Sequence, residues 1–326
     1  MENISVDYMG LKLRSPFIAG SSGFTSKIDN LIALDKAGVG AVVLKSLFEE
    51  QISDQAAFLN EQSSFYPENL DYLHYYLREY SLENYIKLIR SAKNYLQVPV
   101  IASINCYRTG SWLSFAKEIQ NAGADALEIN VYSLPLTKVK SGEELEDEYI
   151  AVITSLTKEL DIPVAVKIGT NFTSLPNFVN GLKICGANAV VMFNKYYHPD
   201  IDLKTLKIIG ANPFSREGDY SDTLRWTAII SSIVGGLDIS ASTGVLSADD
   251  AVKMILAGAT TVQICSAMYK YGAGCVETLN KGLSGFMQER GFNSLDAFRG
   301  MLNYSNIHSP EKYERVQFLK TFGSKE

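Results

Sequence analysis

Short runs of almost wholly apolar residues recur along the chain, and four of them share one local pattern. They lie in the segments 36–45, 121–130, 184–194 and 256–265, where a helical pattern ends at a glycine and a run with β-branched residues follows. Glycine suits the left-handed backbone position that closes a helix. A run that is apolar on both faces is typical of a parallel strand covered by helices. Each segment therefore predicts a helix, a tight turn and a buried strand.

Four further apolar runs lie between these repeats, at residues 16–21, 98–104, 163–169 and 238–243. Helical periodicity separates most of the runs. Eight strand–helix units in a chain of this length favour a (β/α)8 TIM barrel. No Gly-x-Gly-x-x-Gly follows the first run, which argues against a doubly wound open sheet. We therefore predict the α/β class and one barrel domain over residues 1–326.

Two stretches are longer than ordinary connections between a strand and a helix. They span residues 48–81 and 199–226. In a barrel such loops lie over the C-terminal face, where active sites form. We expect extended loops over that face. The tail, residues 283–320, has a helical pattern, and we expect it to form the last packing layer.

Composition excludes several classes of protein. Hydrophobic residues make up 46% of the chain, charged residues 20%, and the net charge is −6. This is an ordinary globular composition, and its acidic balance disfavours nucleic-acid binding and a polybasic membrane anchor. We see neither a signal pattern nor an apolar run of membrane-spanning length. Four widely spaced cysteines predict a reducing, cytoplasmic setting and no metal site.

Polar and basic residues stand where the predicted strands end, and carboxylates are missing there. This set suits a ligand with phosphate and carbonyl groups better than a divalent metal or the carboxylate pair of a glycosidase. The strand ends carry Ser21, Ser22, Gly23, Lys45, Ser46, Ser103, Asn105, Asn130, Ser133, Lys167, Asn194, Lys195, Thr243, Gly244, Cys265 and Ser266.

Two features of these ends are specific enough to suggest a site. Lys45 and Lys167 each end an apolar strand, where a buried ammonium needs an anion or loses its proton. A lone lysine can also extend to the rim of the barrel, but two in one layer favour a shared site. Thr243-Gly244 and Ser266 leave backbone N–H groups free for a phosphate, although a plain tight turn is the alternative. Taken alone, Ser133 is most simply a structural loop serine.

These residues together resemble the dihydroorotate dehydrogenase family of FMN-dependent barrels, over nearly the whole chain. Ser15–Gly23 is similar to the family's N-P-F-x-x-A-S-G segment, and Lys45-Ser46 matches its K-S/T step. Asn130–Ser133 is similar to the N-x-S-C/S pattern, and Pro163–Lys167 matches P-x-x-x-K. Without an N-terminal membrane-docking segment, the soluble class 1-like branch is favoured over the membrane-associated one.

The resemblance implies FMN as cofactor and the oxidation of dihydroorotate, or a related dihydropyrimidine, in pyrimidine biosynthesis. Ser133 would be the catalytic base that removes the C5 proton, and Lys45 would act beside it, while hydride passes to FMN. The implied cofactor contacts are Ser22, Gly23, Lys45, Ser46, Asn130, Lys167, Phe193, Thr243, Gly244, Cys265 and Ser266. The implied substrate contacts are Lys45, Gln62, Asn130, Asn194 and Lys195.

The resemblance diverges at the substrate loop. Leu134-Pro135 replaces a family P-N step, Gln62 stands for an asparagine, and Thr243 and Cys265 stand for glycines. Two other hypotheses therefore stay open: a phosphate-binding lyase or isomerase that uses a Schiff-base lysine, and a flavin-binding paralogue without turnover. A small-molecule substrate is the expected partner. A homodimer is one expected assembly. The aromatic-rich segment 65–80 could form the subunit interface or, equally, a lid over the site.

Overall fold

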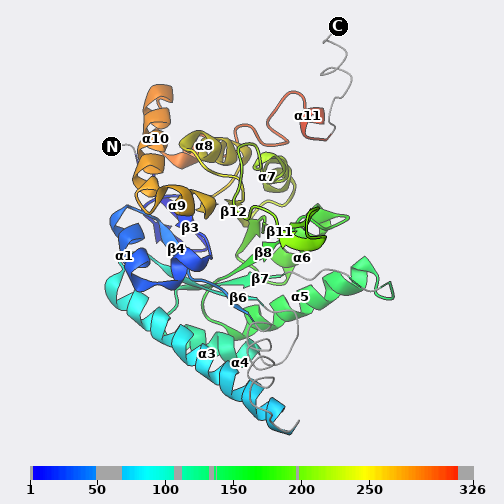
Figure 1. Cartoon of the computed structure of the whole chain (residues 1–326). Coiled ribbons are helices and arrows are strands. Elements are labelled where there is room, and N and C mark those ends of the chain that lie inside the picture. Colours follow the sequence, from blue (N-terminus) through cyan, green and yellow to red (C-terminus); the bar gives the residue numbers. More distant parts are fainter. Residues whose placement is uncertain are drawn as a thin grey trace.

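Eight parallel strands close into a barrel in the computed structural model, which describes residues 3–48, 68–105, 112–131, 136, 138–195 and 198–314. Neighbouring strands pair all the way round, and β4 also pairs with β6, which closes the ring. Every predicted apolar run overlaps one of these strands, so the predicted barrel is confirmed (Figure 1). The strands are β3 (Phe17–Ala19), β4 (Ala41–Val43), β6 (Val100–Asn105), β7 (Ala126–Asn130), β8 (Val164–Ile168), β9 (Ala189–Met192), β12 (Asp238–Ser242) and β13 (Thr261–Ile264).

Helices lie between most of these strands and cover the barrel from outside (Figure 1). Burying the outward face of each strand in this way explains why the strands are apolar on both faces. The helices are α1 (Ile28–Lys36), α3 (Glu68–Tyr95), α4 (Trp112–Asn121), α5 (Gly142–Glu159), α6 (Leu175–Ile184), α7 (Ser221–Ile233), α8 (Ala248–Ala257), α9 (Ser266–Tyr271), α10 (Cys275–Arg290) and α11 (Glu311–Glu314), with short 3-10 turns η1 (Gly23–Ser26) and η2 (Leu295–Ala297).

The glycines of the four sequence repeats all have left-handed backbones. Their φ angles are 89° at Gly38, 99° at Gly123, 94° at Gly186 and 116° at Gly258. Because side chains disfavour this region, glycine ends each helix and turns the chain into the next strand. The repeat seen in the sequence is therefore a repeat of helix–turn–strand geometry.

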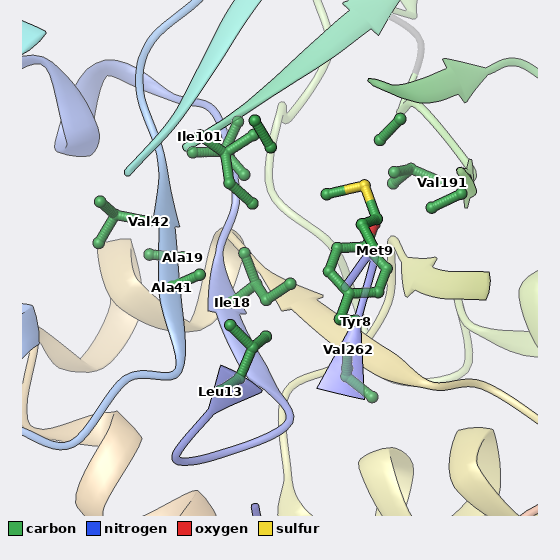
Figure 2. Packing of buried hydrophobic residues seen from close by; sticks show 14 of the residues in the cluster. Tyr8, Met9, Leu13, Ile18, Ala19, Ala41, Val42, Ile101, Val191 and Val262 are labelled. Carbon is green, nitrogen blue, oxygen red and sulfur yellow. The ribbon is translucent and has the colours of Figure 1, made fainter. Parts of the chain in front are cut away.

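An N-terminal hairpin, β1 (Val6–Tyr8) paired with β2 (Leu11–Leu13), fills the end of the barrel opposite the site. Tyr8 and Met9 are buried, and Figure 2 shows them beside core residues such as Ile18 and Val191. Met9 N donates to Asp238 Oδ2 at 2.7 Å, which fixes the hairpin to the start of β12.

The two long insertions follow strand ends, as predicted, and each has secondary structure of its own. The first contains β5 (Leu47–Phe48) and the start of α3, and its residues 49–67 lie outside the described part of the chain. The second holds an antiparallel hairpin, β10 (Pro199–Asp202) with β11 (Lys207–Gly210).

The prediction of a helical tail over residues 283–320 is wrong for most of that length. Helix α10 ends at Arg290, and turns separate it from α11. Gly291 and Gly300 have φ of 72° and 71°, which breaks any helix at those points. The tail is instead held by backbone hydrogen bonds, from Gly300 N to Ile255 O and from Tyr304 N to Ala228 O. Packing against α7 and α8 therefore replaces helical structure.

We expect Gly40→Ala to lower the free energy of unfolding by about 2–3 kcal/mol, the upper range for overpacking a tight core. A Cβ at Gly40 would lie 1.9 Å from the backbone oxygen of Ser15, at the start of the β3–β4 pairing. The matched control is Gly285→Ala, in helix α10, where no atom lies within 4 Å of the added Cβ. Urea denaturation should show the first variant less stable and the control unchanged or more stable. Equal stability of Gly40→Ala and the wild type would contradict this packing.

Candidate active site

Residues from five strand ends line a cavity of about 200 Å³ at the C-terminal mouth of the barrel. Most of them were predicted from the sequence, although they are distant along the chain. The cavity is lined by Ser21, Lys167, Asn194, Lys195, Pro213, Ser215, Ser242, Thr243, Gly244, Val245, Gln263, Cys265 and Ser266.

Lys167 is nine-tenths buried and has the anion that its position requires. Its Nζ donates to Gln263 Oε1 at 3.0 Å and lies 3.7 Å from Glu128 Oε1. Gln263 Nε2 donates in turn to the other oxygen of Glu128. We did not predict Glu128 or Gln263 as site residues, since both lie within apolar strands. Their inward position could have been found by counting back in steps of two from the strand ends.

Two asparagines meet beside this lysine. Asn194 Nδ2 donates to Asn130 Oδ1 at 2.9 Å, and Asn130 is the register partner of Lys167. Asn105 is in turn the register partner of Asn130, and its buried Oδ1 has no hydrogen-bond partner among the residues that the structure describes. A buried amide oxygen normally finds a donor. The predicted pair is therefore part of a row of amides, and Asn105 is a member to which we assigned no role.

Lys195 lies at the boundary between the mouth cavity and a larger one of about 560 Å³, which is also lined by Phe193 and Arg216. Its Nζ is 3.0 Å from Asp219 Oδ2. Desolvation opposes ionisation of Asp219, but the backbone N–H of Arg216 and the Lys195 ammonium outweigh it and hold the pKa of Asp219 below its usual value. This ion pair lines one wall of the approach to Asn194.

Three loops are tied together where the sequence predicts a phosphate site. Ser215 N donates to Ser266 Oγ at 2.8 Å, and Thr243 Oγ1 donates to Phe193 O at 2.8 Å. Thr243 and Gly244 have φ of 80° and 87°, and a Cβ at Gly244 would lie 2.2 Å from the Tyr220 nitrogen. Only glycine fits the second position. Threonine at the first is held in the left-handed region by its own hydrogen bond.

Small and uncharged groups complete this wall. A Cβ at Gly23 would lie 2.8 Å from Tyr269 Oη, so this turn accepts only glycine without displacing the ring. Burial raises the pKa of the Cys265 thiol, and the nearby Lys167 charge and Ser22 only partly offset it. The Cys265 thiol is therefore neutral near pH 7 and acts here as a small packing group.

Among the cavities of the described residues, Lys45 and Lys167 line different ones, and the shared site of the two lysines stays a prediction. Lys45 is half-buried and lines a separate space of about 400 Å³, together with Ser26, Ser46 and residues of α3 such as Tyr85. Hydrogen bonds still join the two cavities, since Ser46 N donates to Ser21 Oγ at 2.9 Å.

Several predicted features cannot be placed. Ser133, Gln62 and the whole segment 65–80 lie outside the described residues or have no described side chains. Among the residues that the structure describes, no three His, Cys, Asp or Glu side chains gather as a metal site would require. Within the same residues, no helix combines the length and the apolar character needed to cross a membrane.

The donor set at the mouth fits FMN. It offers small residues around a turn for a phosphate, amides for a ring with carbonyl groups, and a buried ammonium for negative charge. The Gly244 N–H, which we expected to be free for the phosphate, donates to Ser215 Oγ at 3.3 Å. The unpartnered Oδ1 of Asn105 is the kind of acceptor that the N–H of a bound ring would satisfy.

Comparison with known proteins supports this assignment. The family model described as dihydroorotate dehydrogenase matches residues 3–287. The catalytic subunit of dihydroorotate dehydrogenase B (NAD(+)) of Thermoplasma volcanium is 27% identical, over 92% of this chain and 99% of the relative. The NAD-dependent dihydropyrimidine dehydrogenase subunit PreA of Escherichia coli K12 is 25% identical, over 96% and 80%. The chloroplastic dihydropyrimidine dehydrogenase (NADP(+)) of Arabidopsis thaliana is 26% identical, over 94% and 79%.

Proposed function

The chain belongs to the dihydroorotate dehydrogenase family of FMN-dependent oxidoreductases, and from this premise we propose that it oxidises a dihydropyrimidine at the mouth of the barrel. The observation that carries the proposal is the convergence of Lys167, Asn130 and Asn194 with the Thr243-Gly244 turn around one end of the barrel. No single element could supply this combination of ammonium, amides and phosphate-sized turn.

We assign the cofactor contacts from this arrangement. Thr243-Gly244 and Cys265-Ser266 would hold the phosphate, with Ser22 and Gly23 beside them. Lys167 and the amides of Asn130 and Asn105 would hold the ring. When bound, FMN supplies the two-electron acceptor that the reaction needs.

The chain's own residues then have separate tasks. The Asn130–Asn194 pair would orient substrate carbonyl groups, and Lys45 or Lys195 would attract a substrate carboxylate. Ser133 would remove the proton from one carbon, while hydride leaves the adjacent carbon. The Lys167 ammonium would stabilise the negative charge that develops on the cofactor, because it is fixed in position before the reaction begins.

The substrate is either dihydroorotate, which carries a carboxylate, or an uncharged dihydropyrimidine. Relatives named for both reactions match this chain about equally well. Anaerobic mixing with L-dihydroorotate, dihydrouracil and dihydrothymine, followed by the flavin absorbance near 450 nm, distinguishes the two. Bleaching by at least one of them supports the proposal. A flavin-loaded protein that none of them bleaches would reject it in favour of a paralogue without turnover.

We further propose that the protein forms a homodimer through the β10–β11 hairpin. Ile201 pairs with Ile208 on one face, and Leu203 and Leu206 flank the turn. These four side chains are 61–82% exposed, an unusual amount of apolar surface for one hairpin. Asp200 and Asp202 lie on the same hairpin as Lys204 and Lys207, so a second copy related by a twofold axis offers matching charges.

The double variant Ile201→Asp/Ile208→Asp should convert a dimer into a monomer, because it places charge in the centre of the contact. Sedimentation velocity at several concentrations measures this directly. The matched control is Ile184→Asp, at the end of α6, where an isoleucine is also 77% exposed. A wild type that is monomeric, or one that binds only a different subunit, would overturn the homodimer.

We also propose the cytoplasm as the compartment. Cys185, Cys265 and Cys275, the described cysteines, are all free thiols, which suits a reducing environment.

A further inference from the structure

Glu128 is a buried carboxylate in the middle of an apolar strand, where a charge is rarely found. It is 1% exposed and points into the barrel from β7, two residues before Asn130. Since Asn130 is level with Lys167, Glu128 lies one layer beneath the mouth. Its carboxylate is therefore shielded from solvent by the layer that contains Asn130 and Lys167.

Glu128, Gln263 and Lys167 form a closed ring from three strands. Gln263 accepts from the lysine through Oε1 and donates to the glutamate through Nε2. The remaining glutamate oxygen is 3.7 Å from Lys167 Nζ, too far for a good hydrogen bond but close enough for a strong charge interaction. Glu128 thus fixes the direction of the Gln263 amide, and that amide fixes the ammonium.

Among the described residues, no cation other than Lys167 balances the negative charge of Glu128. Among the described ion pairs, its only cation is Lys167. From below it faces Tyr8, whose pKa is raised well above its usual value by burial and then by the charges of Glu128 and Asp238, so that Tyr8 stays neutral. The field of Lys167 at the mouth is therefore that of a nearly neutral pair rather than a free cation.

We propose that Glu128 is a positioning residue that sets the reduction potential of the bound flavin through Lys167. Its negative charge partly cancels the lysine field, which makes the cofactor harder to reduce. Its hydrogen bond to Gln263 keeps the ammonium in one place. The Lys167 ammonium has three N–H donors, and its hydrogen bond to Gln263 uses one of them. The other two N–H groups can therefore face the cofactor. This inference rests on the proposed function, since it requires FMN at the mouth.

The test is the midpoint potential of bound FMN, measured anaerobically against a reference dye in wild type and variants. Glu128→Gln keeps the shape of the side chain and removes its charge, and it should shift the potential to a more positive value. Glu128→Asp retains the charge and should stay nearer the wild type. Thr261→Val, a buried and uncharged change in the same barrel, is the packing control and should leave the potential unchanged.

If Glu128→Gln alone fails to fold, the effect of the Glu128 charge can be measured in the Lys167→Met variant instead. Lys167→Met should lower the potential, and Glu128→Gln/Lys167→Met should raise it again towards the wild-type value. An unchanged potential on removing the Glu128 charge, in either background and with FMN bound, would overturn the inference. Failure of every variant and of the wild type to take up FMN would instead reject the proposed function.

Discussion

Lys167→Met is expected to lower the rate of dihydropyrimidine oxidation by about 10²–10³-fold, the range for losing one preorganised electrostatic group. The reason is that Lys167 is the buried ammonium at the mouth cavity, and its position is fixed by Gln263 and Glu128. Stability should fall as well. Removing one partner of a buried ion pair leaves the Glu128 carboxylate without compensation, which costs about 3–5 kcal/mol.

The two effects can be separated. Rapid mixing of the flavin-loaded variant with substrate measures the rate, and urea denaturation measures the stability. The double variant Glu128→Gln/Lys167→Met removes the stranded charge, so it should regain most of the lost stability but not the lost rate. A single variant with wild-type rate and stability would show that the ion pair has neither role.

Ser133→Ala should reduce the rate of flavin bleaching by about 10²–10⁴-fold, as expected for loss of a general base. Ser133 lies outside the described residues, but the chain leaves β7 beside Lys167, because Val131 N donates to Lys167 O at 2.9 Å. The end of β7, from which this loop begins, therefore lies level with Lys167. FMN affinity should be unchanged, since the hydroxyl is assigned to the substrate rather than the cofactor.

Ser133→Cys is the matched control for this prediction. A cysteine thiolate can accept a proton at the same place, so this variant should retain more activity than the alanine variant. If Ser133→Ala bleaches as fast as the wild type, another group is the base. The measurement thus tests the role that only the family resemblance assigns.

The contacts of Lys167 disfavour the alternative in which this lysine forms a Schiff base with the substrate. An ammonium held by an amide oxygen and a carboxylate is a poor nucleophile, because a Schiff base needs the free amine. Lys45, which has no ion pair or hydrogen bond to the described residues, is the better candidate for such chemistry. Among the described cavities, it lines a different one from the predicted phosphate loops.

The barrel could be predicted because its signals are local. Strands apolar on both faces and helices that end at Gly38, Gly123, Gly186 and Gly258 need no knowledge of distant contacts. The tail could not be predicted, because its polar periodicity looks helical while Gly291, Gly300 and hydrogen bonds to α7 and α8 decide the structure.

The strand-end residues of the site were predictable for a similar reason, but their partners were not. Register across neighbouring strands brings Asn105, Asn130 and Lys167 to one level. These residues stand at or near the ends of the predicted strands, so their common level could be expected from the sequence. Glu128 and Gln263 were missed because they lie beneath that level.

Titration of the apoprotein with FMN tests the central claim most directly. Flavin fluorescence reports binding, and riboflavin, which lacks the phosphate, is the matched ligand control. We expect one FMN per chain and at least about tenfold weaker binding of riboflavin, since each 1.4 kcal/mol of lost phosphate contact is a factor of ten. A protein that binds neither ligand, or binds both equally well, would contradict the assignment of the barrel mouth as a flavin site.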